Sequence, residues 1–447
     1  MIFGKKQSQR DDDDDDDEDE EEEELNLVTF MGAINGVSPD FSANAKLVQA
    51  GLGRAKELVT DALSRRAEMI RLEPKGQAAV ATFFVDGIPY PAARMPAQAG
   101  MAITQVMKLL AGLDVRERTK PQSGGLKATF EELPYELKVD SAPLKEGGER
   151  MVVRARNTKV RMETPDDLGF GDTLKNKIRD MTCQQKGIVL AAGPPMSGVS
   201  TLAFAILRGV DAYIYTVYSM FDLQRDMAHI SQFKGEPGDD FLKTITRAKR
   251  AEANVLYFEA IKSAEQAKLI LDQADNVCIV SEIPARDASD AIARFRNHTG
   301  DPSLTAERLL GVFCQKLVRL LCDKCRQAYR PNPKLLQRVG LPPETKVLYR
   351  AYQFDPDEAE DDEEEPETCE KCGGVGYFGR AAMVELVEVT EGVRAVIAAG
   401  SDAVAIKAQA RKEKMQSFQS DGLRLVAAGK TSLEELQRVF KSDTAPG

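Results

Sequence analysis

The spacing of apolar residues predicts a small α+β domain over residues 25–160. Apolar positions recur at helical intervals over residues 43–66, and a second helix is expected over 97–113. Residues 80–90 are rich in β-forming side chains and contain a central Asp-Gly pair, which is typical of a β-hairpin. Further strands are expected at residues 69–74, 126–130, 135–139 and 150–154.

From about residue 167 the pattern changes to short apolar strands that alternate with helical segments. This alternation predicts an α/β fold with a doubly wound, mainly parallel sheet. We also expect helices over residues 308–321 and 385–440, where apolar positions recur at helical spacing. The expected strands are 188–192, 212–217, 255–258 and 277–280, and the helices between them include 263–273 and 288–297.

The net charge of -11 conceals two acidic runs, 14 consecutive carboxylates at residues 11–24 and ten more within 355–367. Once these 24 carboxylates are set aside, the remaining charge is +13. The runs are either solvated, disordered segments or shields for a basic surface that meets anionic lipid, nucleic acid or an acidic partner. We expect no nucleic-acid partner, because no recognition motif accompanies the charge.

Neither a transmembrane segment nor a secretory signal is expected. No run approaches 18 consecutive apolar residues, and the N-terminus is polar and then acidic. We therefore expect a cytoplasmic protein.

A loop with a glycine at each end lies between an apolar strand and a helix within residues 187–202. This layout is typical of a phosphate-binding loop, in which backbone N–H groups and the helix N-terminus form an anion site. Gly193, Gly198 and Ser200 match the pattern G-x-x-x-x-G-K-[ST], but Val199 stands at the lysine position. The loop therefore either binds nucleotide weakly or survives only because strand, turn and helix must pack. The candidate nucleotide-binding residues are Gly193, Pro194, Met196, Ser197, Gly198, Ser200 and Thr201.

Four of the seven cysteines form two C-x-x-C pairs. Cys322 and Cys325 are separated by 43 residues from Cys369 and Cys372, and the second acidic run lies between the pairs. Paired knuckles of this kind predict a structural, four-thiolate Zn²⁺ site with no open position for water. A vestigial site with free thiols is the alternative. We expect the solitary Cys183, Cys278 and Cys314 to be inert core residues.

Many ordered segments resemble the type II secretion and type IV pilus assembly ATPases, the GspE/PilB/PilT-like motor proteins. The resemblance implies a RecA-like P-loop core and a PAS-like N-terminal domain. It also implies ATP hydrolysis, a hexameric ring, and docking on an inner-membrane platform protein at the cytoplasmic side of the inner membrane. The matching segments are residues 84–87, 111–118, 121–124, 315–325, 369–380, 385–389 and 421–435. The domains expected on this basis are a disordered acidic tail (1–24), the N-terminal domain (25–160), the P-loop domain (167–320), a zinc hairpin with its acidic insertion at 355–367 (321–380) and a helical C-terminal subdomain (381–447).

The residues that carry hydrolysis in this family are replaced at four motifs. Losing one such group costs on the order of 10²–10⁵ in rate, so the resemblance implies a catalytically defective paralogue. We expect a structural or regulatory subunit of a homo- or hetero-oligomer that binds ATP and Mg²⁺ weakly or not at all. The alternative is an active motor that uses a substitute cation such as Lys262 or Arg250. The replacements are Val199 for the loop lysine, Tyr218 and Ser219 for a Glu-Asp pair, Ala260 for the water-activating glutamate and Pro284 for a histidine.

Overall fold

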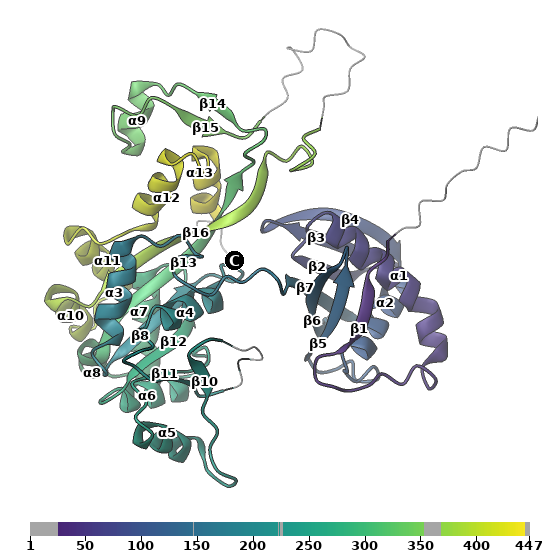
Figure 1. Cartoon of the computed structure of the whole chain (residues 1–447), viewed down its shortest axis with the longest axis horizontal. Coiled ribbons are helices and arrows are strands. Elements are labelled where there is room, and N and C mark those ends of the chain that lie inside the picture. Colours follow the sequence, from purple (N-terminus) through teal and green to yellow (C-terminus); the bar gives the residue numbers. More distant parts are fainter. Residues whose placement is uncertain (1–25, 146, 222, 224–226, 353–367, 443–447) are drawn as a thin grey trace, which may run out of the picture. The chain divides into compact units, whose positions relative to one another are not determined.

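The computed structural model describes residues 26–145, 147–221, 223, 227–352 and 368–442. The chain divides into two compact units, Met1–Lys159 and Val160–Gly447 (Figure 1). The two acidic runs, which we expected to be disordered, lie outside the described residues. Among the described helices, none combines the length and the apolar character needed to cross a membrane.

The first unit is an antiparallel sheet of seven strands with two helices, α1 and α2, packed against it (Figure 1). The helices expected over residues 43–66 and 97–113 are confirmed as α1 and α2. The hairpin is also confirmed, because Asp86 and Gly87 have φ angles of 50° and 80°, as a type I′ turn requires. The strand order is β1-β5-β6-β7-β2-β3-β4. The elements are β1 (Thr29–Ala33), α1 (Ala45–Ser64), β2 (Met69–Lys75), β3 (Ala78–Val85), β4 (Ile88–Pro96), α2 (Ala97–Leu110), β5 (Gln122–Phe130), β6 (Leu133–Pro143) and β7 (Glu149–Asn157).

The second unit is built on a mixed sheet of seven strands in the order β10-β9-β11-β12-β8-β13-β16. The first six strands are parallel to one another, and β16 is antiparallel to β13. The predicted α/β fold with a mainly parallel sheet is therefore confirmed. The strands are β8 (Ile188–Gly193), β9 (Val217–Ser219), β10 (Ile230–Gln232), β11 (Val255–Tyr257), β12 (Cys278–Pro284), β13 (Leu309–Leu321) and β16 (Tyr377–Glu388), with β14 (Gln327–Tyr329) and β15 (Leu348–Arg350) forming a separate pair.

Helices cover both faces of this sheet. One face packs against α3 and α4, and the other packs against the remaining helices of the unit. Each face has its own apolar cluster, so the central strands are buried on both sides. The helices are α3 (Asp172–Thr182), α4 (Val199–Arg208), α5 (Phe241–Arg250), α6 (Ala264–Gln273), α7 (Ala288–Thr299), α8 (Pro302–Arg308), α9 (Pro333–Val339), α10 (Glu391–Ala398), α11 (Ala403–Lys412), α12 (Phe418–Ala427) and α13 (Leu433–Ser442).

Two expected helical regions are partly strands. Residues 309–321 form β13, and β16 continues to Glu388 before the C-terminal helices begin. Because β13 lies between β8 and β16 with both faces covered, apolar residues occupy both of its faces on either side of Gln315 and Lys316. The strand therefore lacks the alternation that marks a half-exposed strand. The strands β13 and β16 also cross the expected segment boundaries at residues 320 and 380, so the residues from 160 onward share one compact unit.

The strand expected at residues 212–217 is also wrong. The strand β9 begins only at Val217, and residues 212–214 form a turn. Tyr213 and Ile214, which suggested a buried strand, are 99% and 68% exposed. The prediction failed because apolar residues also occur on protein surfaces, so hydrophobicity alone does not show that a segment is buried.

A buried ion pair attaches the last helix to β13. The guanidinium of Arg319 donates to Glu435 through Nη2 at 2.8 Å and Nε at 3.0 Å, and the Arg319 backbone N–H donates to the other carboxylate oxygen at 3.0 Å. Arg438, which is 40% exposed, donates to the same carboxylate. The guanidinium of Arg319 also lies 4.0 Å from the centroid of the Tyr377 ring on β16. These contacts hold α13 against the end of the sheet.

We expect Glu435→Ala to lower the free energy of unfolding of the second unit by about 3 kcal/mol, because it leaves the guanidinium of Arg319, whose side chain is only 13% exposed, without its carboxylate. Arg438→Ala is the matched control and should cost less than about 1 kcal/mol, since this pair is solvent-exposed on the arginine side. Urea unfolding followed by circular dichroism measures both. Equal losses in the two variants would contradict the assignment.

The same carboxylate should make stability depend on pH. Burial alone would raise the pKa of Glu435, but hydrogen bonds from Arg438 and Arg319 lower it below the ordinary value of 4.5. A lowered folded-state pKa means that this stabilisation is complete above about pH 4.5 and is lost as the pH falls through the folded value. The stability difference between the wild type and Glu435→Gln should therefore shrink on acidification. A difference that grows at low pH would contradict this sign.

Candidate functional site

The four replaced motifs lie at or next to the carboxyl ends of parallel strands of the second sheet. Val199 follows β8, Tyr218 and Ser219 lie on β9, Ala260 follows β11, and Pro284 ends β12. The strands β8, β9, β11 and β12 are parallel, so their carboxyl ends share one edge, which is where ligands bind in open α/β sheets. Pro284 at the end of β12 lies opposite Gly193 at the end of β8 in the ladder. The candidate phosphate loop follows Gly193 directly and leads into α4.

The loop has the strand-glycine-helix layout that the sequence predicts for a phosphate-binding loop. A Cβ on Gly193 would lie 2.2 Å from Ser197 Oγ and 2.6 Å from the Gln315 carbonyl oxygen, so only glycine fits there. Gly198 precedes α4 with a φ of 78°, and no described side chain caps that helix. Met196 also adopts a left-handed φ of 65°, which costs a non-glycine residue on the order of 1 kcal/mol. The N-terminus of α4 thus directs the positive end of the helix dipole toward the loop.

Gln315 of β13 fastens the loop from within the sheet. Its Nε2 donates to the carbonyl oxygens of Ser197 at 2.7 Å and Gly198 at 3.2 Å. Ser197 Oγ and Gln315 Oε1 are buried without a hydrogen-bond partner in the described part of the chain. The loop is therefore held by the protein itself through its carbonyl groups.

A buried carboxylate faces the loop where a metal-bound phosphate would be expected. Ser200 Oγ donates to Glu282 Oε2 at 2.9 Å, and the Tyr257 hydroxyl donates to Glu282 Oε1. Glu282 is 8% exposed, and burial raises the pKa of its carboxyl against the opposing effect of the two hydroxyl donors. The serine hydroxyl that would meet Mg²⁺ in a P-loop NTPase is therefore engaged by a carboxylate of the chain.

The replaced positions on α4 and β9 are occupied by packing residues. Val199 contributes to the apolar cluster under α3 and α4. Tyr218 contacts the edge of the Phe233 ring with 5.2 Å between centroids. Ser219 is fully buried and donates to the Phe221 carbonyl oxygen at 2.7 Å. These side chains bring no charge to the site.

The segment after β11 also lacks an inward carboxylate. Ala260 is half-buried, and the neighbouring Glu259 is exposed while its carbonyl oxygen accepts from Ser281 Oγ at 2.8 Å. Lys262 and Arg250, the candidate substitute cations, are both exposed. Asp222, an acidic residue that follows β9 in the sequence, lies outside the described residues.

Sequence reasoning assigned no role to Glu282, Tyr257 or Gln315, the three side chains that organise the site. A signal for Glu282 was available, because it is the only charged residue in the apolar run 277–285. A buried, unexplained carboxylate in a central strand is a common mark of a functional position. Tyr257 and Gln315 carry no comparable sequence signal.

The four paired cysteines form a second site at the end of β13 and β16. Their Sγ atoms all lie within 4.8 Å of one another, with 3.9 Å between Cys322 and Cys369 and 3.6 Å between Cys325 and Cys372. Tetrahedral Zn²⁺ with Zn–S bonds of about 2.3 Å places sulfurs about 3.8 Å apart. The four cysteines are positioned to hold a metal ion, and the donor set is consistent with zinc.

Backbone geometry supports this cluster. Backbone N–H groups of Cys372 and Lys371 donate to the Cys369 thiol and lower its pKa to about 7. The Gly376 N–H points at Cys372 Sγ at 3.3 Å, and Gly376 has a φ of 75°. The pairing of Leu321 with Tyr377 brings the two knuckles together.

The solitary cysteines differ from one another. Cys278 and Cys314 are fully buried, as expected for core residues, and burial raises the pKa of Cys278 to about 12. Cys183 is exposed, so its expected core position is wrong. It lies just past the end of α3, where the chain turns back to the surface.

We expect the purified chain to hold one zinc ion, and Cys369→Ser to lose it, because a tetrahedral site needs all four thiolates. Cys183→Ser, which changes an exposed thiol outside the cluster, is the matched control and should retain the metal. Elemental analysis after gel filtration measures the stoichiometry. A wild-type chain purified without metal, or full retention in Cys369→Ser, would contradict the site.

Comparison with known proteins places the chain among secretion and pilus ATPases. The profile of the family described as "Type II/IV secretion system protein" matches residues 51–438. The type IV pilus assembly ATPase PilB of Thermus thermophilus is 28% identical over 385 residues, which is 85% of this chain and 42% of that protein. The type II secretion system protein E of Dickeya dadantii is 27% identical over 391 residues, which is 86% of this chain and 75% of that protein.

The fold has a counterpart among solved structures. The ATPase DotB of Legionella pneumophila aligns with a TM-score of 0.51 at 16% identity, over 88% of this chain and 96% of that chain. At this identity the likeness concerns the fold alone. Since the family profile covers most of its residues, the chain belongs to the type II/IV secretion system protein family.

Proposed function

We propose that this chain is a catalytically defective member of the secretion and pilus motor family, acting as a structural or regulatory subunit of a type II secretion or type IV pilus-like machine. The contact between Ser200 and Glu282 carries this proposal. A buried carboxylate at the loop hydroxyl disfavours phosphate by charge, and Val199 provides no ammonium to offset it. The residues present therefore fit an Mg-ATP complex poorly.

The remaining parts of the proposal rest on the family. The second unit would be a RecA-like core that keeps its assembly surfaces, joins a homo- or hetero-hexameric ring, and docks on an inner-membrane platform protein from the cytoplasm. Zn²⁺ would be structural, because four thiolates leave no open position. The chain spans less than half of the length of the Thermus relative. The hexameric ring and its docking partner are therefore part of the proposal.

A second candidate function is supported by the same carboxylate. Glu282 is buried and hydrogen-bonded to the loop serine, which is the position of a group that could orient a metal or water. In an active motor, Glu282 would replace the missing glutamate at position 260. The two functions predict different effects on Mg-ATP binding and turnover when the charge of Glu282 is removed.

We expect Glu282→Gln to strengthen Mg-ATP binding while phosphate release stays at background, because the substitution keeps the shape of the side chain but removes its charge. The double variant Val199→Lys with Glu282→Gln should bind about 10–100-fold more tightly than the wild type, since it also gains a charge-assisted phosphate contact. Isothermal titration with Mg-ATP and a phosphate-release assay on the full chain measure both quantities.

Glu259→Ala is the matched control for the Glu282 variant, since it removes an exposed carboxylate from the same edge of the sheet. It should change neither quantity. Turnover by the wild type that disappears in Glu282→Gln would establish the active-motor alternative instead. Turnover that depends on Glu259 would point to a displaced catalytic glutamate.

A further inference from the structure

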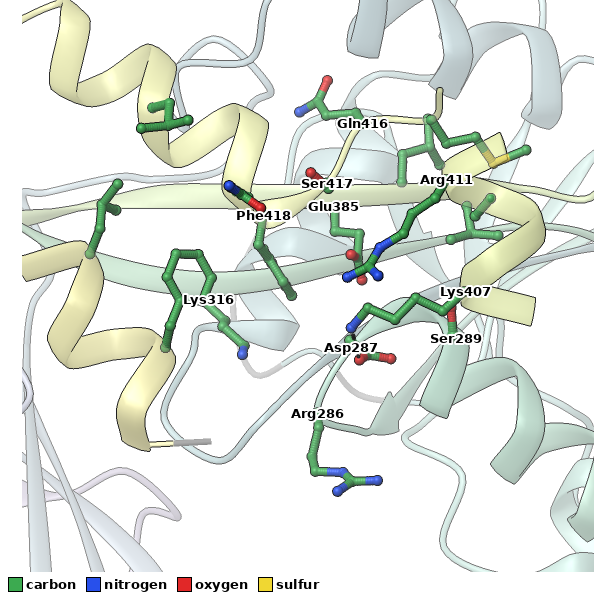
Figure 2. A pocket seen from close by; sticks show the side chains of 18 of the residues that line it. Arg286, Asp287, Ser289, Lys316, Glu385, Lys407, Arg411, Gln416, Ser417 and Phe418 are labelled. Atoms are coloured by element: carbon green, nitrogen blue, oxygen red, sulfur yellow. Dashed lines mark hydrogen bonds and ion pairs between the residues drawn. The ribbon is translucent and has the colours of Figure 1, made fainter. Parts of the chain in front are cut away.

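A second hollow lies on the face of the sheet opposite the phosphate loop. It has a volume of about 850 Å³ and is lined by the start of α7, the end of α9, the strands β13 and β16, and the helices α11, α12 and α13 (Figure 2). Successive side chains of a strand point to opposite faces. Gln315 accordingly holds the phosphate loop, whereas the next residue, Lys316, lines this pocket. The pocket is therefore separate from the candidate nucleotide site.

The floor of the pocket contains charged groups that are mostly hidden from solvent. Lys316 is 5% exposed, with its Nζ 4.9 Å from the centroid of the Phe418 ring. Glu385 is 7% exposed and accepts a 2.9 Å hydrogen bond from the Ala288 N–H at the start of α7. Lys407 pairs with Asp287 at 2.7 Å. The floor thus already holds carboxylates of the chain beside a helix N-terminus and two ammonium groups.

Cations outnumber carboxylates around the pocket. The lining includes five basic and three acidic side chains, and Asp290, one of the acids, pairs with both Arg294 outside the lining and Arg286 within it. In Figure 2 the side chain of Arg411 extends from α11 toward Glu385, and its guanidinium comes from an exposed residue. An excess of positive charge around a concave surface concentrates anions there.

The walls are apolar and reach the surface. Phe418, Met415 and Val404 line the pocket, and Val404 is 74% exposed at its mouth. A volume of this size falls in the range of small-molecule sites, roughly 300–1,000 Å³. An apolar wall beside basic side chains suits a ligand with an apolar body and an acidic group.

We propose that this pocket binds a small organic anion, with its phosphate or carboxylate group held by Arg411 and its apolar body packed against Phe418. Guanidinium groups recognise such acidic groups through paired hydrogen bonds. The proposal does not depend on the state of the phosphate loop, because none of the loop residues lines this pocket.

The test uses the fluorescent aromatic sulfonate ANS with the full, folded chain. ANS should bind, and 1-naphthyl phosphate should displace it better than either inorganic phosphate or 1-naphthol, since only the phosphate ester offers both halves of the ligand. Arg411→Ala should weaken ANS binding about tenfold, because a charge-assisted hydrogen bond is lost. Arg411→Lys should recover part of the affinity.

Lys412→Ala is the matched control. Lys412 is the next residue on α11, is exposed and does not line the pocket, so its loss should leave ANS binding unchanged. Equal losses in the two variants, or displacement by 1-naphthol as strong as by 1-naphthyl phosphate, would overturn the proposal. ANS binding that appears only when an oligomer is diluted into single chains would also overturn it, in favour of a second copy covering the pocket.

The same variants distinguish binding in this pocket from binding at the candidate nucleotide site. Mg-ATP binding that is lost in Arg411→Ala but unchanged in Glu282→Gln would belong to this pocket and would support it. Failure of ANS to bind the wild type would overturn the pocket proposal and leave the defective-motor proposal intact.

Discussion

The second unit depends on one strand that is buried on both faces. Along β13, Gln315 faces the phosphate loop and Lys316 faces the opposite pocket, because adjacent side chains alternate. Farther along, Arg319 anchors the last helix through Glu435, and the strand ends at the first cysteine pair. A one-residue shift in the register of β13 would exchange its two faces and disrupt all of these contacts together. The strand therefore couples four features that are remote in the sequence.

The candidate phosphate loop is held by contacts within the protein. Gly193 is required by contacts with Ser197 and Gln315, and these contacts belong to the protein rather than to a ligand. The buried carboxylate of Glu282 adds hydrogen bonds from two hydroxyl groups in the same region. Folding alone can thus preserve the loop, whereas phosphoryl transfer needs positive charge and positioned acids.

The cysteine cluster follows from the same strand pairing. The strands β13 and β16 are antiparallel neighbours, so the residues just after one and just before the other must meet. The intervening chain, including β14 and β15, begins and ends at this cluster. A metal ion held there would join the two ends of this long intervening segment. Closing a long loop in this way removes conformational entropy from the unfolded chain and so stabilises the fold.

The sequence by itself determined the family, the mainly parallel sheet, the strand-loop-helix order around the candidate phosphate loop and the cysteine quartet. Each of these is recorded by local spacing, such as strand-turn-helix order or two C-x-x-C pairs. Only the tertiary structure decided that residues 309–321 form a strand, because burial on both faces removes the alternation that a sequence pattern needs. It also brought Glu282 to Ser200 and Arg411 to the pocket, since contacts between residues far apart in the chain are set by packing rather than by spacing.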